Sequence, residues 1–418
     1  MPDPALADHA AAAGRLDTLL HDLDYLVHAT PHLLRHALAY TRTPAGTLLA
    51  DIYRASADVH ATAGPNARRD ILAIDAARYQ QPAIAHALSR ARPWQPRWAT
   101  GALVHPALRT TITTPKKPIA IAMGVVDGHP VAVTCGYEDR VVRVWDLTTG
   151  TEHAVLTGHT HWVTAVAVGA LDGRPVAVTV GEDPTPGAIG GDDRTVRVWD
   201  LATGTEHAAL GNRTERMNVV AVAEVDGRPV ALTGGSPSSA VRVWDLTTPQ
   251  SQFSALTGDF SEVTAVAVGE VDGRPVAVTA HHHIMVLVWD LATGTELATL
   301  THPRMVTAMA VGALDGRPVA VIGTEDRMVR VWDLATGTQH ATFRTNRVDT
   351  VAVAEVDGRP VAVTGGDDDG TVRVWDLATG TEHAVLTGHT KRVVAVGALD
   401  GRPVAVTGGE DCTVRVWD

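Results

Sequence analysis

The stretch VTAVAVGALDGRPVAVTV (163–180), followed after an insertion by TVRVWDLATGTEHAAL (195–210), decides the fold of this chain. Its Trp-Asp pair, Trp199-Asp200, returns with Trp at 145, 244, 289, 332, 375 and 417, so seven of the ten tryptophans occupy one column of an internal repeat. The copies follow at intervals of 42 to 54 residues, and residues 145–160 and 375–390 differ at one position only. Self-similarity at this period indicates a fold built from repeated supersecondary units.

Each copy contains four short β-rich segments separated by turn residues. In the second copy, VTAVAV (163–168) leads to Asp172-Gly173, a pair that tolerates the positive φ angles of a tight hairpin. Pro175 can open the next strand, and TVRVW (195–199) and TEHAAL (205–210) complete the copy. The inner segments are apolar on both faces, which suits sheets stacked face to face. Four strands in each of seven copies predict a β-propeller.

The TVRVWD segments and the Gly-His pairs resemble the WD-repeat β-propeller family over residues 99–418. The resemblance implies a mainly β fold: a seven-bladed WD-repeat β-propeller, preceded by a small α-helical domain at 1–98. Propellers of this family commonly close with one blade that takes strands from both ends of the chain. The last copy stops at Asp418 after its third strand, and 99–108 aligns with the fourth strand of the repeat. We therefore expect about 99–112 to be the outer strand of the last blade, which would remove an exposed sheet edge.

Residues 1–98 show a helical pattern. Apolar residues recur at spacings of three and four, as at Leu16, Leu19, Leu20 and Leu23. Prolines at positions typical of helix starts support the same assignment. We expect helices at roughly 4–13, 15–21, 31–41, 44–61, 66–80 and 82–91.

This helical stretch resembles the linker that precedes WD propellers in actinobacterial signal-transduction ATPases with numerous domains. The chain itself contains no Gly-x4-Gly-Lys-Ser/Thr phosphate loop, so it carries no ATPase of that type. The resemblance implies bacterial signal transduction, with an ATPase signalling module acting in trans as a candidate partner. The helices would then pack as an amphipathic bundle or serve as a docking scaffold.

The charge balance and the chain's apolar runs limit its partners. Lys and Arg number 35 against 47 Asp and Glu, a formal net charge of −12. A general nucleic-acid binder needs a basic surface, so we expect no nucleic-acid partner. No apolar run approaches the roughly 18–20 residues of a membrane span, and MPDPALADHA lacks the basic and apolar regions of a signal peptide. Cys135 and Cys412 cannot form a disulfide framework. We expect a cytoplasmic protein without a membrane partner.

The family resemblance implies a structural tetrad in each blade: a His before the first strand, a Ser or Thr in the second, a turn Asp, and the Trp. Two copies match in full, with His159, Thr179, Asp193 and Trp199, and with His389, Thr407, Asp411 and Trp417. In the fifth copy Ile322 stands at the hydroxyl position, so we expect a broken network there. The Trp partner and the repetition indicate a buried structural network and not a catalytic His-Asp dyad.

No motif indicates catalysis. In His281-His282-His283, neighbours on a strand would alternate faces and not converge on one metal, and we expect a solvated turn or a weak adventitious metal site there. Asp367-Asp368-Asp369 lacks the spaced ligands of a calcium loop. The chain has no nucleophile elbow, redox Cys-x-x-Cys or zinc signature. We therefore expect no enzyme activity, no catalytic residue, no cofactor and no specific metal site.

The copies differ most in the segment before each first strand. Aligned on the Asp-Gly turn, the residue before that strand is Lys117, Trp162, Arg216, Glu262, Met305, Arg347 or Arg392. In a propeller these loops gather at one end, together with the turns between second and third strands, where Tyr137 lies. Arg, Trp and Met are favoured at binding hot spots.

We therefore expect a non-catalytic scaffold or sensor that binds a peptide or protein partner through these eight residues. Acidic or mixed-charge groups of the partner would face Arg216, Arg347 and Arg392. The alternatives are an enzyme or a small-molecule sensor that uses the mouth of the propeller channel.

Overall fold

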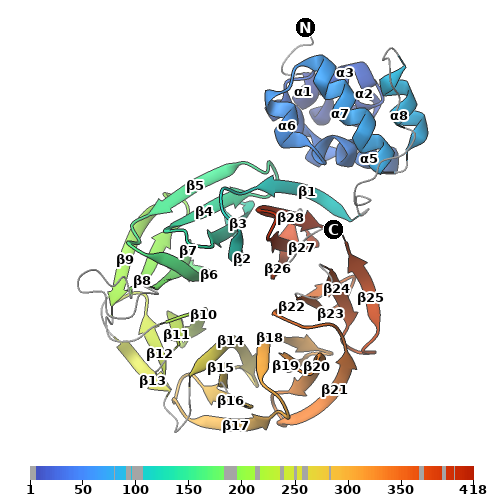
Figure 1. Ribbon diagram of the computed structural model, residues 1–418. Coiled ribbons are helices and arrows are strands. Elements are labelled where there is room, and N and C mark those ends of the chain that lie inside the picture. Colours follow the sequence, from blue (N-terminus) through green and yellow to red (C-terminus); the bar gives the residue numbers. More distant parts are fainter. Residues whose placement is uncertain are drawn as a thin grey trace. The chain divides into compact units, whose positions relative to one another are not determined.

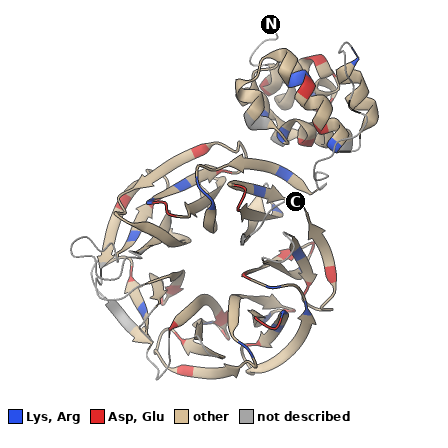
Figure 2. Ribbon diagram, viewed as in Figure 1, with Lys and Arg blue, Asp and Glu red and all other residues tan. Residues whose placement is uncertain are grey.

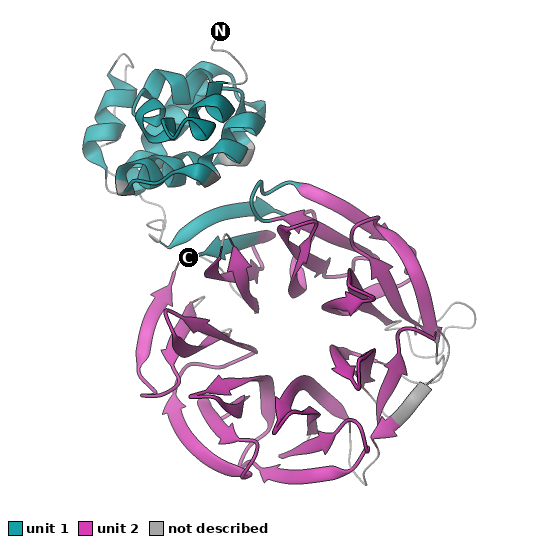
Figure 3. Ribbon diagram, turned by 180° about the vertical axis from the view of Figure 1, so that it is seen from behind, with its two compact units in different colours: residues 1–113, 147–151, 414–418 teal, residues 114–146, 152–413 magenta. Residues whose placement is uncertain are grey.

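The computed structural model describes residues 6–79, 81–90, 96, 107–182, 195–211, 217–235, 240–248, 252–256, 262–281, 284–366, 371–387, 392–399 and 401–418. The chain forms two compact units (Figure 3). The first contains residues 1–113, 147–151 and 414–418, and the second contains 114–146 and 152–413.

The helices all lie in the first unit and share a core of leucine and aromatic side chains, among them Leu20, Leu34, Tyr53 and Leu72. Four of them begin with a proline, whose fixed φ suits the first helical position. None of the helices in the described residues is long and apolar enough to cross a bilayer. They are α1 (Leu6–Ala12), α2 (Leu16–Leu20), α3 (Leu23–His28), α4 (Pro31–Ala37), the 3₁₀ helix η1 (Leu38–Tyr40), α5 (Pro44–Arg54), α6 (Ala57–Thr62), α7 (Pro65–Arg78) and α8 (Pro82–Ser89).

Two details of the helical pattern differ from the prediction. Helix α3 was not predicted, and it forms because the Asp22 carboxylate accepts hydrogen bonds from the backbone N–H groups of Asp24 and Tyr25. The single helix expected at 44–61 is two helices, α5 and α6. The break falls at Ser56, whose φ of −130° and ψ of 33° are not helical.

Seven four-stranded antiparallel sheets, the blades, follow one another around a ring (Figure 1). The first three are β2–β5 (Pro118–Val126, His129–Gly136, Val141–Asp146, Glu152–Thr157), β6–β9 (Trp162–Leu171, Arg174–Glu182, Thr195–Asp200, Thr205–Gly211) and β10–β13 (Val219–Val225, Arg228–Gly234, Val241–Asp245, Gln252–Leu256). The next three are β14–β17 (Val263–Val271, Arg274–His281, Met285–Asp290, Glu296–Thr301), β18–β21 (Val306–Leu314, Arg317–Thr324, Met328–Asp333, Thr338–Arg344) and β22–β25 (Thr350–Val356, Arg359–Gly365, Val372–Asp376, Glu382–Leu386). The seventh has the order β1–β28–β27–β26, with β1 (Leu108–Thr113), β26 (Arg392–Leu399), β27 (Arg402–Gly409) and β28 (Thr413–Trp417).

The hairpin between the first two strands of each of blades 1 to 6 is a two-residue turn. In blade 2, Asp172 and Gly173 join β6 to β7 with φ angles of 50° and 77°. Positive φ at both positions is what a turn with the twist of the strands requires, and Asp-Gly tolerates it. The second strands are buried on both faces, as Val176, Ala177 and Val178 show with exposed fractions of 2% or less.

The inner strands pack against one another around the whole ring, β2 on β6 and so on to β26 on β2. The contacts between them are close: a Cβ on Gly169 would come within 2.3 Å of Val222 in blade 3, and one on Gly312 within 2.3 Å of Val353 in blade 6. Glycine thus lets neighbouring inner strands approach closely. Because the inner strands run in the same direction, all their first residues lie at one end of the ring and all the Asp-Gly turns at the other.

The seventh blade takes its outer strand from near the start of the chain and its other three from the end. The Asp418 N–H donates to the Ala107 carbonyl over 2.8 Å, and the Thr114 N–H donates to the Cys412 carbonyl over 2.8 Å. Arg109 also contacts the Asp418 carboxylate at 3.3 Å. Strand β1 covers the later part of the predicted range 99–112 and one residue more, and residues 99–106 lie outside the described residues.

Removing β1 should open the ring. We expect a protein truncated to residues 114–418 to aggregate, because the edge of β28 would present unpaired backbone groups. A protein truncated to 99–418 keeps β1 and serves as the matched control. Size-exclusion chromatography and thermal unfolding would test this. A monomeric 114–418 protein that unfolds cooperatively would contradict the closure by β1.

Candidate partner-binding site

The loops that lead into the inner strands and the turns between second and third strands lie at one end of the ring, here called the variable end. In blade 1 the β3–β4 turn begins at Tyr137, whose N–H donates to the Lys117 carbonyl over 2.7 Å. The Asp139 carbonyl of the same turn accepts from the N–H of Val163 in blade 2 over 2.9 Å. These two bonds fix the turn between the starts of β2 and β6.

Three of the predicted partner-binding residues lie together at this point. The Tyr137 and Trp162 ring centroids are 6.1 Å apart with the planes tilted by 36°. The Lys117 ammonium lies 5.9 Å from the centre of the Tyr137 ring, within range of a cation–π interaction, and 2.6 Å from the Glu410 carboxylate of blade 7. Tyr137 is 53% exposed and Trp162 is half-buried, so the pair offers aromatic surface to solvent.

The remaining predicted residues are spread around the ring. Glu262 and Met305 directly precede β14 and β18, and both are half-buried. Arg347 is exposed before β22, and its guanidinium contacts the Asp349 carboxylate at 2.9 Å. Arg392 is the first residue of β26, and its side chain is not described; Arg216 lies outside the described residues. A Trp162 contact to Tyr137 crosses from one blade to the next, so no pattern within a single copy indicated it.

Inside the blades, a buried Thr accepts a hydrogen bond from the indole N–H of the repeated Trp. In blade 2 the Trp199 Nε1–H donates to Thr179 Oγ1 over 2.8 Å, and His159 Nε2 lies 2.8 Å from the same oxygen. Equivalent Trp–Thr bonds of 2.8 to 3.0 Å join Trp145 to Thr134, Trp244 to Thr233, Trp289 to Thr279, and Trp375 to Thr364. Buried polar groups satisfied in this way hold the second and third strands in register.

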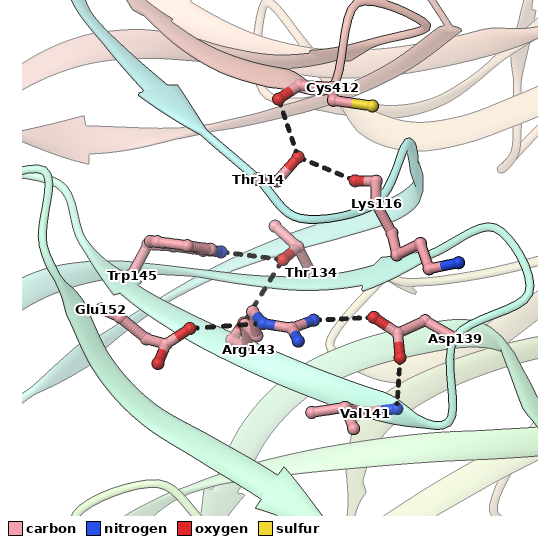
Figure 4. A network of polar contacts seen from close by, with 9 residues as sticks. All are labelled: Thr114, Lys116, Thr134, Asp139, Val141, Arg143, Trp145, Glu152 and Cys412. Carbon is pink, nitrogen blue, oxygen red and sulfur yellow. Dashed lines mark hydrogen bonds and ion pairs between the residues drawn. The ribbon is translucent and has the colours of Figure 1, made fainter. Parts of the chain in front are cut away.

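Blade 1 shows how a network adapts when the His is absent (Figure 4). Thr114 stands at the His position and contacts the carbonyls of Lys116 at 2.8 Å and Cys412 at 3.0 Å instead of Thr134. The turn residue Asp139 contacts Arg143 at 2.7 Å, and Arg143 also contacts Glu152 at 3.3 Å. The turn Asp therefore binds an Arg on the third strand of its own blade.

The other tetrad residues are placed as follows. Asp193 and His389 lie outside the described residues. Thr407 on β27 and Trp417 on β28 are each 1% exposed. Asp411 lies in the turn before β28 and accepts hydrogen bonds from the N–H and hydroxyl of Thr413.

Blade 4 corrects the interpretation of the histidine run. His281 is not part of a solvated turn; it is the last residue of β15, 3% exposed, and its Nε2 lies 3.1 Å from Thr279 Oγ1. It therefore contacts the buried Thr of its blade, as His159, which precedes the first strand, contacts Thr179 in blade 2. Because it arrives from two residues after the Thr, an alignment to the usual His position could not find it. His282 and His283 lie outside the described residues.

Blade 5 has no hydroxyl at the position of Ile322. Among the described residues, the Trp332 Nε1 and both ring nitrogens of His302 have no hydrogen-bond partner, although His302 is 1% exposed. Burial lowers the pKa of His302 to about 4; Arg330 acts in the same direction and Asp326 opposes it. A second network lies nearby, in which Arg330 contacts Asp326 at 2.6 Å and lowers its pKa to about 2.

The opposite end of the ring carries a hollow of about 660 Å³ between blades 3 and 4, lined in part by Ala223, Glu224, Val268 and Glu270. Ala223 stands where blades 1, 2, 4, 5 and 7 have glycine, and its methyl group adds volume between the two inner strands. Within the described part of the chain, no three His, Cys, Asp or Glu residues are grouped so that they could hold a metal ion.

The family model described as "WD domain, G-beta repeat" matches residues 150–200, 337–376 and 380–418. No curated protein matches the chain. The match and the seven blades together support a WD-repeat β-propeller. Propellers of this family are generally protein-interaction scaffolds and are typically non-catalytic.

The Thr–Trp bond can be tested by comparing Thr with Val, which has the same shape, at two positions. Thr179→Val should lower the free energy of unfolding by about 1–3 kcal/mol, because Trp199 and His159 lose their shared partner. At position 322, Ile322→Thr should be more stable than Ile322→Val by about 1 kcal/mol, because the new hydroxyl can accept from Trp332. Chemical denaturation measures both differences. Equal free energies of unfolding for the Val and Thr forms at either position would contradict a stabilising role for the network.

The buried His302 should make stability depend on pH. The unfolded chain takes up its proton near pH 6.5, whereas the folded chain does so only near pH 4. Above about pH 6.5 His302 is neutral in both states, so its titration leaves stability unchanged. As the pH falls from about 6.5 to about 4, only the unfolded chain binds the proton, which lowers the free energy of unfolding. The difference in unfolding free energy between wild type and His302→Phe should change across this window and stay constant above it. A difference that is independent of pH would contradict the neutral buried state.

Proposed function

We propose that the protein is a non-catalytic scaffold or sensor whose propeller binds a peptide or protein partner at the variable end. The observation that carries the proposal is where the copies differ. Six Asp-Gly turns adopt the same positive-φ geometry at one end of the ring, whereas the residues before the inner strands differ at the other. Since near-identical blades cannot supply specificity, it must come from the positions that differ.

Two features of the variable end support this function. Tyr137 and Trp162 expose aromatic surface beside charged groups, the composition that binding hot spots favour. Arg347 is exposed, and its ion pair with Asp349 is of the solvated kind that contributes little and can be exchanged for a partner's carboxylate. Figure 2 shows Lys and Arg interspersed with Asp and Glu around the ring, which favours a mixed-charge partner over nucleic acid.

The helical residues before the propeller would couple this binding to another domain or chain. Their resemblance to the linker of signal-transduction ATPases makes an ATPase module acting in trans a candidate for that role. In this proposal the protein works in the cytoplasm of a bacterium.

A pull-down from native cell lysate tests the proposed function. Wild type should capture a partner that Arg216→Glu/Arg347→Glu/Arg392→Glu does not, because charge reversal repels the partner's acidic groups. Arg174→Glu/Arg228→Glu/Arg274→Glu makes the same charge change at the opposite end and should retain it. All three proteins should melt at similar temperatures. Equal capture by both variants would exclude the variable end as the binding surface.

A further inference from the structure

Residue types that are rare in the propeller gather in one sector of the variable end. Its only Tyr is Tyr137, and its only Trp outside the Trp-Asp pairs is Trp162. The three lysines of the whole chain are Lys116, Lys117 and Lys391, against 32 arginines. Lys116, Lys117 and Tyr137 lie at this end of blade 1, and Trp162 is the first residue of β6 in the neighbouring blade 2. Lys391 lies outside the described residues. Tyr, Lys and a Trp outside the Trp-Asp pairs occur nowhere else in the propeller.

The residues of this sector are held in a fixed arrangement. The backbone bonds from Tyr137 to Lys117 and from Val163 to Asp139 clamp the β3–β4 turn between two inner strands. A Cβ placed on Gly136 would lie 2.5 Å from the Lys116 Cβ and 3.4 Å from the Asp139 Cβ, so the loop before β2 packs directly on this turn. Such a clamped surface loses little conformational entropy when a partner binds.

Basic side chains are exposed in this sector, although the protein has a net charge of −12. Lys116 and Arg140 are exposed, and within the described residues neither makes an ion pair. Lys117 is paired with Glu410, but both side chains are partly exposed, at 27% and 44%, so a ligand carboxylate can replace that partner. Asp139 is neutralised by Arg143, which leaves Glu138 as the opposing carboxylate of the turn.

We propose that Lys116, Lys117, Tyr137, Arg140 and Trp162, here called the blade 1 patch, bind an acidic peptide segment in which a carboxylate adjoins an apolar or aromatic side chain. The carboxylate would be recognised by the ammonium and guanidinium groups, and the apolar side chain would pack on the Tyr137 and Trp162 rings. This inference rests on the proposed function and names the chemistry of its partner.

The test is selection from a displayed library of short random peptides on the immobilised full-length protein. The enriched peptides should combine Asp or Glu with an apolar or aromatic residue, and they should dissociate as salt is raised. By fluorescence anisotropy, Lys116→Glu/Arg140→Glu should weaken them by about tenfold or more. Tyr137→Ala should weaken them by a similar factor. Enrichment of basic or uncharged peptides, or of none, would overturn the inference.

Arg304→Glu/Arg327→Glu is the matched control, because both are exposed residues of the corresponding loop and turn in blade 5 and the variant reverses the same number of charges. It should leave the affinity for the selected peptides within about twofold. An equal loss with this variant would also overturn the inference, since the effect would then reflect net charge alone. The lysate experiment separates the two proposals. A partner lost by the arginine triple variant but kept by Lys116→Glu/Arg140→Glu would leave the variable end as the binding surface and exclude the blade 1 patch.

Discussion

The pairing of β1 with β28 is the constraint on which the rest of the propeller depends. Every other blade is a local meander whose four strands follow one another in the chain, whereas this one joins segments about three hundred residues apart. The backbone bonds at its two ends, from Asp418 to Ala107 and from Thr114 to Cys412, span the whole strand. Because a closed ring has no first or last blade, each inner strand has a neighbour on both sides, and the apolar faces of all seven sheets are covered.

Close packing of the inner strands then limits where the sequence can vary. Glycines that face valines across blade boundaries, such as Gly169 and Gly312, leave no room there for a larger side chain, and the buried Thr–Trp bonds of blades 1, 2, 3, 4 and 6 each require both residue types. The loops of the variable end carry no such demand. Close packing therefore keeps the strands of the copies alike, and the residues that differ lie in the loops at the variable end, where a partner can reach them.

The sequence predicted the blades well because each rests on local chemistry that repeats. Asp172-Gly173 forms the expected hairpin turn, and the strands of blade 2 cover the expected segments. Features that depart from the repeat could not be predicted in the same way. His281 contacts the buried Thr279 in place of the His that other copies have before the first strand, and it does so from the end of the second strand. Helix α3 depends on one capping carboxylate, that of Asp22. The contact between Tyr137 and Trp162 depends on how two blades meet, which no single copy encodes.

The strand that completes the seventh blade reads LRTTIT, unlike the TEHAVL-type outer strands of most other blades. In a protein whose units are so alike that 145–160 and 375–390 differ at one residue, any outer strand could otherwise be exchanged for another, within one molecule or between two. A closing strand with its own sequence belongs to one place only. Its sequence therefore distinguishes the closing strand from the repeated outer strands. A ring with one blade too few, or with a blade taken from a second molecule, would lack the pairing of β1 with β28.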